Sequence, residues 1–146
     1  MRYFDHDYVE DLIKRLARIP PDAKPRWGKM TPRVMVQHLA DTVRFSMGKA
    51  GDLPDRSNAF SRRVVAPLIL NGIVPIPKNL KAPPYPKGSS QGDTETLHAI
   101  LDEYLGLVQV GDLTPKRHPV LGDLGIDGWA KMHYRHFEHH LKQFGV

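Results

Sequence analysis

Hydrophobic positions recur at helical spacing in four separate stretches of the chain, with polar positions between them. Stripes of this kind are typical of amphipathic helices that bury one face. We therefore predict four long helices, over residues 5–19, from Pro32 to about Met47, from Asp93 or Thr94 to Gly111, and from about Ile126 to Phe144.

Residues at the helix ends support these boundaries. Asp7 and Glu10 have the spacing of a capping pair for the first helix. Thr31 supplies a cap for the second helix, and the proline after it stands at the first helical position, where its missing N–H costs nothing. Gly48 is suited to ending that helix.

The segment from residue 49 to residue 92 departs from this pattern. A short helix is predicted over residues 57–72, interrupted at Pro67, and four prolines between residues 77 and 86 exclude a regular helix or a central strand there. No stretch alternates as a strand would. The pattern predicts an all-α single domain over residues 1–146, a four-helix bundle with a long Pro-rich connection between its second and third helices.

Composition narrows the possible chemistry. The chain has no cysteine, which excludes disulfides and thiolate ligands and leaves histidine to bind any soft metal. The formal net charge of +5 favours anionic partners, but the basic residues are scattered, so nucleic acid is not the expected partner. The N-terminus has no apolar signal core, and no apolar stretch could span a bilayer, so we expect a soluble, cytoplasmic protein without a membrane partner.

The last predicted helix carries an unusual set of histidines. His136 and His140 are four residues apart on one face, which they share with His133 and three large aromatic residues, so the face points inward. Buried imidazoles need partners, and a metal ion would serve two of them at once. A third ligand could come from His38, which lies on the apolar stripe of the second helix.

Structural explanations compete with this hypothesis. The pair could be core histidines bonded to carbonyl groups or part of a solvated face, and for His38 taken alone a structural role is the simpler explanation. His139 falls off the edge of the stripe and is expected in solvent. The remaining histidines, His6, His98 and His118, show no partner pattern and are expected to be structural or at the surface.

Two stretches resemble a known family. A tryptophan and a methionine precede the helix-two histidine, an H-P-x-x-G turn precedes an L-x-x-x-x-W helix start, and the chain closes with H-x-x-H-H-L-x-Q-F-G; these are Trp27, Met30, His38, His118, Pro119, Gly122, Leu124, Trp129 and His136 to Gly145. In these residues the chain resembles the DinB-like superfamily, specifically its branch called domain of unknown function 1569. The chain differs from the family pattern at Gly125–Gly128, where branch members often carry a Ser/Thr cap and glutamates.

The resemblance implies a four-helix bundle in which His38, His136 and His140 hold a divalent metal ion, with His133 as a fourth candidate. Imidazole ligands suit zinc, nickel, iron or copper. Three neutral ligands leave a coordination position open, which is typical of a catalytic site. Superfamily relatives include transferases and isomerases that use low-molecular-weight thiols, so a metal-dependent thiol transferase or hydrolase acting on a small electrophile is implied.

Further residues could complete such a site. Asp41, one turn after His38, could act as catalytic base or orient the imidazole, although acid–histidine pairs at this spacing are commonplace. Glu103 and Tyr104 could reach the bundle interior, Tyr104 more simply as a core residue. The alternatives to an enzyme are a metal-binding, stress-related bundle without turnover, acting as a homodimer, and a basic adaptor for nucleic acid.

Overall fold

The computed structural model describes residues 4–78, 80–86 and 89–146, and its regular elements are all helical. The isolated bridge between His118 and Gly122 is the only β-type pairing among these residues. The all-α prediction is therefore confirmed. The elements are α1 (His6–Ala17), α2 (Pro32–Ser46), the π-helical segment η1 (Ser61–Val65), α3 (Ala66–Leu70), α4 (Thr94–Gln109) and α5 (Gly125–Gln143).

Most of the predicted caps form. Thr31 Oγ1 accepts a hydrogen bond from the backbone N–H of Val34 at the start of α2, and Asp93 accepts one from Thr96 at the start of α4, both at 3.2 Å. The predicted pairing of Asp7 with Glu10 is wrong. Asp5 caps α1 instead, because the helix already begins at His6 and the Asp5 carboxylate accepts from the N–H of Tyr8 at 2.7 Å.

The predicted interruption at Pro67 is also wrong. Residues 59–70 are helical throughout, but the backbone widens into the π-helical η1 just before the proline, where the N–H of Ala66 donates to the carbonyl of Ser61, five residues back. A widened turn accommodates a proline, which has no N–H and crowds the preceding turn. The described residues of the Pro-rich tract after α3 form neither helix nor strand, as expected.

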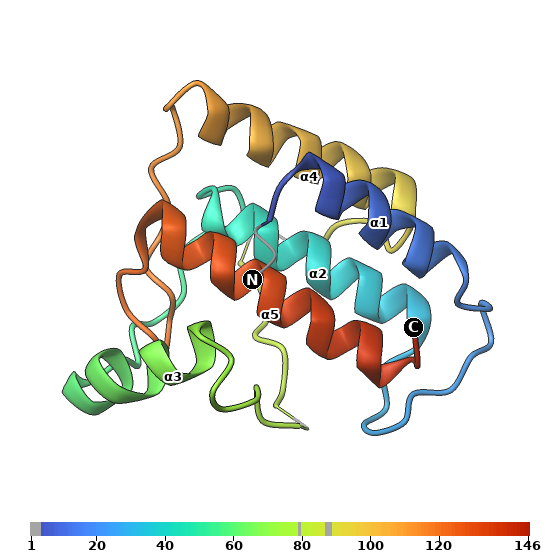
Figure 1. Cartoon of the computed structure of the whole chain (residues 1–146), viewed down its shortest axis with the longest axis horizontal. Helices are drawn as coiled ribbons and strands as arrows, with labels where there is room; N and C mark the ends of the chain where they lie inside the picture. Colours follow the sequence, from blue (N-terminus) through green and yellow to red (C-terminus); the bar gives the residue numbers. More distant parts are fainter. Residues whose placement is uncertain (1–3, 79, 87–88) are drawn as a thin grey trace.

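The four longer helices pack around a common core. α2 contacts both α4 and α5, α1 contacts α4, and the short α3 contacts α5, so α2 lies between α4 and α5 (Figure 1). The larger hydrophobic cluster joins all four through fully buried residues such as Leu12, Leu39, Leu101 and Phe137. A smaller cluster under α3 includes Ile69 and Trp129.

Polar contacts fix α1 against α5. Arg15 Nη1 lies 2.9 Å from Glu138 Oε2, and the hydroxyl of Tyr8 donates to the same oxygen at 3.0 Å. None of the helices in the described part of the chain is long and apolar enough to cross a membrane.

His118 holds the turn before α5, which confirms the expectation of a structural residue. Its Nδ1 accepts hydrogen bonds from the backbone N–H groups of Val120 and Leu121, at 3.1 and 3.0 Å, and its ring lies against Trp129. An imidazole nitrogen can accept only while it is unprotonated. Burial accordingly lowers the pKa of His118 to about 4 from its ordinary value of 6.5.

This turn makes stability depend on pH. Between the unfolded pKa of 6.5 and the folded pKa of about 4, the unfolded chain binds more protons, so the free energy of unfolding falls as the pH drops through this range. His118→Asn keeps an acceptor atom but does not titrate, so its free energy of unfolding should fall less, by about 1–3 kcal/mol. Urea denaturation at several pH values checks this, and parallel curves for both proteins would contradict it.

Tyr104 lies in the core, as expected, but its hydroxyl is buried without a hydrogen-bond partner among the described residues. Removing an unpartnered polar atom costs little, whereas removing a buried ring leaves a cavity. Tyr104→Phe should therefore change the free energy of unfolding by less than about 1 kcal/mol, while Phe137→Ala should lower it by about 3–5 kcal/mol. Denaturant melts measure both, and a loss above about 2 kcal/mol in Tyr104→Phe would show that the hydroxyl is bonded.

Candidate metal centre

The centre is built from one turn of α2 and two turns of α5. His38 shares its stripe on α2 with the buried Met35 and Leu39, so the packing that buries these residues also turns His38 toward α5. His136 and His140 face it from consecutive turns of α5 and are almost fully buried, with 8% and 7% of their surfaces exposed. His38 is half-buried.

The three rings converge closely. Nε2 of His38 lies 2.8 Å from Nε2 of His136, although the residues are 98 positions apart in the chain. The ring centroids of His38 and His140 are 5.1 Å apart, and those of His136 and His140 are 4.8 Å apart. One nitrogen from each ring falls within 4.8 Å of the other two, a grouping that could hold one metal ion. The structure thus brings together all three predicted ligands.

The rings are uncharged at neutral pH. Burial lowers the pKa of His38 to about 4 and that of His140 to about 3; His139 lowers the pKa of His38 further, and His38 lowers that of His140 further. Burial lowers the pKa of His136 well below its usual range, and the neighbouring His38 and His140 lower it further. Metals bind the neutral form of imidazole, so protons compete weakly for these nitrogens.

The hydrogen bonding of the rings also fits an ion. Nδ1 of His38 and Nδ1 of His136 are both buried without a hydrogen-bond partner among the described residues. The Nε2–Nε2 contact can use only one proton, so without an ion one ring keeps an unused lone pair and the other an unused N–H. With an ion, both Nε2 lone pairs are used. Three imidazole nitrogens without a carboxylate suit zinc, nickel, iron or copper better than magnesium or calcium.

Gln143 forms a hydrogen bond with the ring of His140. Gln143 Nε2 donates to the backbone carbonyl of Trp27 at 3.0 Å, which leaves its Oε1 to accept from Nδ1 of His140 at 2.7 Å. The proton of His140 therefore sits on Nδ1, and Nε2 carries the lone pair. This chain of bonds fixes both the tautomer and the ring orientation, as outer partners of metal-binding histidines usually do.

His133 does not join the three rings. Ser46 donates its hydroxyl proton to the carbonyl of Val43 at 2.6 Å, so its oxygen accepts from Nε2 of His133 at 3.1 Å. The ring is fully buried and packs on Trp129 and Tyr104. The Nε2 of His133 is therefore hydrogen-bonded within the core, while its buried Nδ1 has no hydrogen-bond partner among the described residues.

Asp41 contacts the connector rather than the rings. Its buried Oδ1 accepts from the backbone N–H of Ser90 at 2.7 Å and from Arg44 Nη1 at 3.2 Å. One position later, the hydroxyl of Thr42 donates to the carbonyl of His38 at 2.9 Å and lies 3.1 Å from the hydroxyl of Tyr85. The turn after His38 therefore anchors the Pro-rich segment.

Two expectations about side chains near the site are wrong. Glu103 does not reach the interior, because it forms an ion pair with Lys49 and is 47% exposed. His139 is not simply solvated, because its ring packs between Trp27 and His140, with centroid distances of 5.3 and 5.1 Å. His98 does lie at the surface, where its Nε2 is 2.9 Å from Glu10.

Gln143 and the carbonyl of Trp27 are functional groups of the site that were not predicted from the sequence. Gln143 follows His140 by three residues, a spacing that places them on neighbouring positions of one helix face and could have indicated the contact. The contact to Trp27 spans 116 positions and has no local signal.

Loss of the Gln143 contact should weaken metal binding. We expect Gln143→Leu to lower the affinity for zinc about 10- to 100-fold, because His140 loses its acceptor and its fixed tautomer. Competition with a chromogenic chelator measures the affinity. Gln109→Leu, at an exposed position of α4, is the matched control and should bind as the wild type does; equal affinities of all three proteins would contradict the role of Gln143.

Comparison with known proteins gives one family. Residues 9–145 match the family described as "Protein of unknown function (DUF1569)". No curated protein and no solved structure matched the chain.

Proposed function

The chain belongs to the DUF1569 family, and we propose that it binds a divalent metal ion through His38, His136 and His140 and uses it in a thiol-transferase or hydrolase reaction. The observation that carries the proposal is the convergence of three neutral imidazoles from two helices. The structural alternative explains the group less well, because the 2.8 Å contact between Nε2 of His38 and Nε2 of His136 can use only one lone pair without an ion, whereas an ion would use both.

The chemistry such an ion supplies when bound is Lewis acidity, which lowers the pKa of water or a thiol and polarises a carbonyl group. The ligands themselves are neutral and leave the charge of the ion uncompensated. His38 is the least buried of the three rings, so substrate would approach from its side. Gln143 keeps Nε2 of His140 unprotonated and pointed into the group.

Asp41 is the candidate catalytic base of this proposal. Its carboxylate is one turn from His38, but its Oδ1 is already engaged by the backbone N–H of Ser90 in the Pro-rich segment and by Arg44 on α2. That engagement favours a second candidate function, a metal-binding protein without turnover. Turnover measurements separate the two.

The kind of reaction comes from the resemblance to the DinB-like superfamily. We propose that the four long helices form the bundle of that superfamily and that a low-molecular-weight thiol is the cosubstrate for a small electrophile. The all-α architecture and the placement of the three histidines on α2 and α5 support this assignment.

Metal content tests the centre. Untagged protein should carry about one zinc, nickel or iron ion per chain, and His136→Ala or His38→Ala should remove it, because two imidazoles hold an ion poorly. His98→Ala, on the surface of α4, is the control and should keep the metal. Elemental analysis after dialysis gives the stoichiometry, and a metal-free wild type or full occupancy in His136→Ala would refute the centre.

Turnover tests the reaction. Metal-loaded protein should consume an electrophile such as a chlorinated nitrobenzene in the presence of a thiol, or hydrolyse a small ester, and His136→Ala should abolish either activity. Asp41→Asn should lower it about 100-fold if Asp41 is the base. Full metal occupancy without any turnover across a panel of thiols and esters would leave the non-catalytic function.

A further inference from the structure

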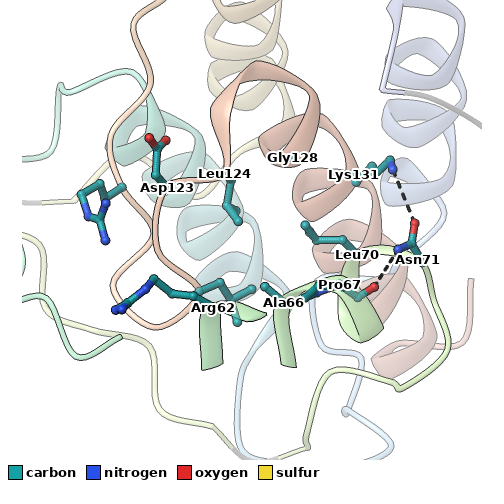
Figure 2. A pocket seen from close by; sticks show the side chains of 11 residues that line it. Arg62, Ala66, Pro67, Leu70, Asn71, Asp123, Leu124, Gly128 and Lys131 are labelled. Atoms are coloured by element: carbon teal, nitrogen blue, oxygen red, sulfur yellow. Dashed lines mark hydrogen bonds between the residues drawn. The ribbon is translucent and has the colours of Figure 1, made fainter. Parts of the chain in front are cut away.

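A groove of about 680 Å³ lies between the helical run that contains η1 and α3 and the first turns of α5 (Figure 2). His38, His136 and His140 are not part of its lining. Its volume is in the range of small-molecule sites. The floor is apolar: Ala66 and Leu121 are buried, and Leu70 and Leu124 are half-buried, with Leu124 standing between the two ends of the groove in Figure 2.

Two arginines meet at one end of the groove. A Cβ at residue 122 would lie 2.6 Å from Cδ of Arg62 and 3.6 Å from Nη2 of Arg117. Gly122 also has φ of +84°, so glycine is required both by the backbone and by the approach of Arg62. The turn held by His118 therefore brings the aliphatic part of the Arg62 side chain and the guanidinium group of Arg117 to the same glycine.

These arginines are only partly neutralised. Arg62 Nη1 donates to the neutral hydroxyl of Ser57 at 3.1 Å. Arg117 Nε lies 3.6 Å from Asp55 Oδ2, a long ion pair between two half-exposed side chains. Such exposed pairs contribute little to stability. Hydrogen bonds from Ser57, and then Arg117 and Arg62, lower the pKa of the Asp55 carboxyl group, so an added anion competes with Asp55 for both guanidinium groups. Asp55 itself lies outside the lining of the groove.

The other charges along the groove leave it positive. Lys131 stands at the opposite end, with Nζ 3.4 Å from Asn71 Oδ1 (Figure 2). Asp123 is the acidic residue of the lining, but its carboxylate accepts from the N–H of Gly125 at 3.3 Å and points away from Arg62 in Figure 2. The lining thus combines three cations and one carboxylate with an apolar floor.

We propose that this groove binds a small organic anion with an unbranched apolar body. Its carboxylate lies against Arg62 and Arg117, whose planar guanidinium groups match carboxylate geometry. Its apolar chain covers Leu124 and Leu70, which water otherwise contacts.

The site is independent of the candidate metal centre. Lys131 and His136 are five residues apart on α5, which places them about 140° apart around the helix. A ligand in the groove therefore lies on a different face of α5 from the three imidazoles, and loss of one site does not imply loss of the other.

Titration with octanoate tests the proposal. In ¹⁵N-labelled protein, octanoate should produce saturable shifts of the Gly128 amide and the Asn71 side-chain amide, both in the lining. 1-Octanol has the chain without the charge, and inorganic phosphate has charge without the chain, so each should bind at least about tenfold more weakly. His136→Ala should bind octanoate as the wild type does.

Variants identify the anchoring charges. Arg62→Gln and Arg117→Gln should each weaken octanoate binding about tenfold, the size expected for one hydrogen bond to a charged group. Arg63→Gln is the matched control, because Arg63 is the exposed neighbour of Arg62 and lies outside the lining. If thermal melts show that Arg62→Gln does not fold, the octanoate affinity of Arg117→Gln alone tests whether the arginines bind the carboxylate.

Three results would overturn the proposal: no saturable shifts with octanoate, equal binding of octanoate and 1-octanol, or the same loss in Arg63→Gln as in the lining variants. Absence of saturable shifts would mean that octanoate has no site in the groove. Equal binding of 1-octanol would mean that the carboxylate contributes nothing, and an equal loss in Arg63→Gln would mean that only the net charge of the protein matters.

Discussion

The burial of three uncharged imidazoles between α2 and α5 is the constraint on which the arrangement of this protein depends. Imidazole nitrogens that are removed from water must find partners or cost free energy. Here Nε2 of His38 and Nε2 of His136 approach to 2.8 Å, and Nδ1 of each ring has no hydrogen-bond partner in the part of the chain that the structure describes. A slip of one residue along either helix would rotate a ligand about 100° out of the group, so the site fixes the register of the two helices.

The same constraint organises the loops. Gln143 links His140 to the carbonyl of Trp27 in the segment before α2. Asp41 and Thr42, one turn after His38, contact Ser90 and Tyr85 in the Pro-rich connector. The turns that carry His38 and His140 therefore also hold segments without regular structure. Prolines limit the backbone freedom of the connector, which lowers the entropy lost when it is held.

Charge is distributed differently in the two sites. The histidine group is neutral because burial suppresses protonation, and a bound cation would be its only charge. In the groove beside α3, the cations are fixed arginine and lysine side chains over an apolar floor. The net charge of +5 indicated anionic partners without locating them, and the turn at Gly122 gathers part of that charge in one place.

The sequence by itself determined the features that rest on contacts within one or two helical turns. Apolar spacing predicted the four long helices, Thr31 and Asp93 predicted the caps of two of them, and the four-residue spacing of His136 and His140 predicted two of the three candidate ligands. The place of His38 on the apolar stripe of the second helix made it a possible third ligand, and only the resemblance to a family favoured this over a structural role. The cap of α1 and the π-helical turn before Pro67 were missed, because two aspartates compete for the first position and because a widened turn is one of several responses to a proline.

Only the tertiary structure decided which of these residues meet. It places His38 beside His136, 98 positions away in the chain, and pairs His133 with Ser46 and Asp41 with Ser90. It also places the side chains of Arg62 and Arg117 close to Gly122. The physical reason is that hydrophobic periodicity fixes which face of a helix is buried but not which partner covers it. That choice is made by close packing of all the helices at once, which no local pattern contains.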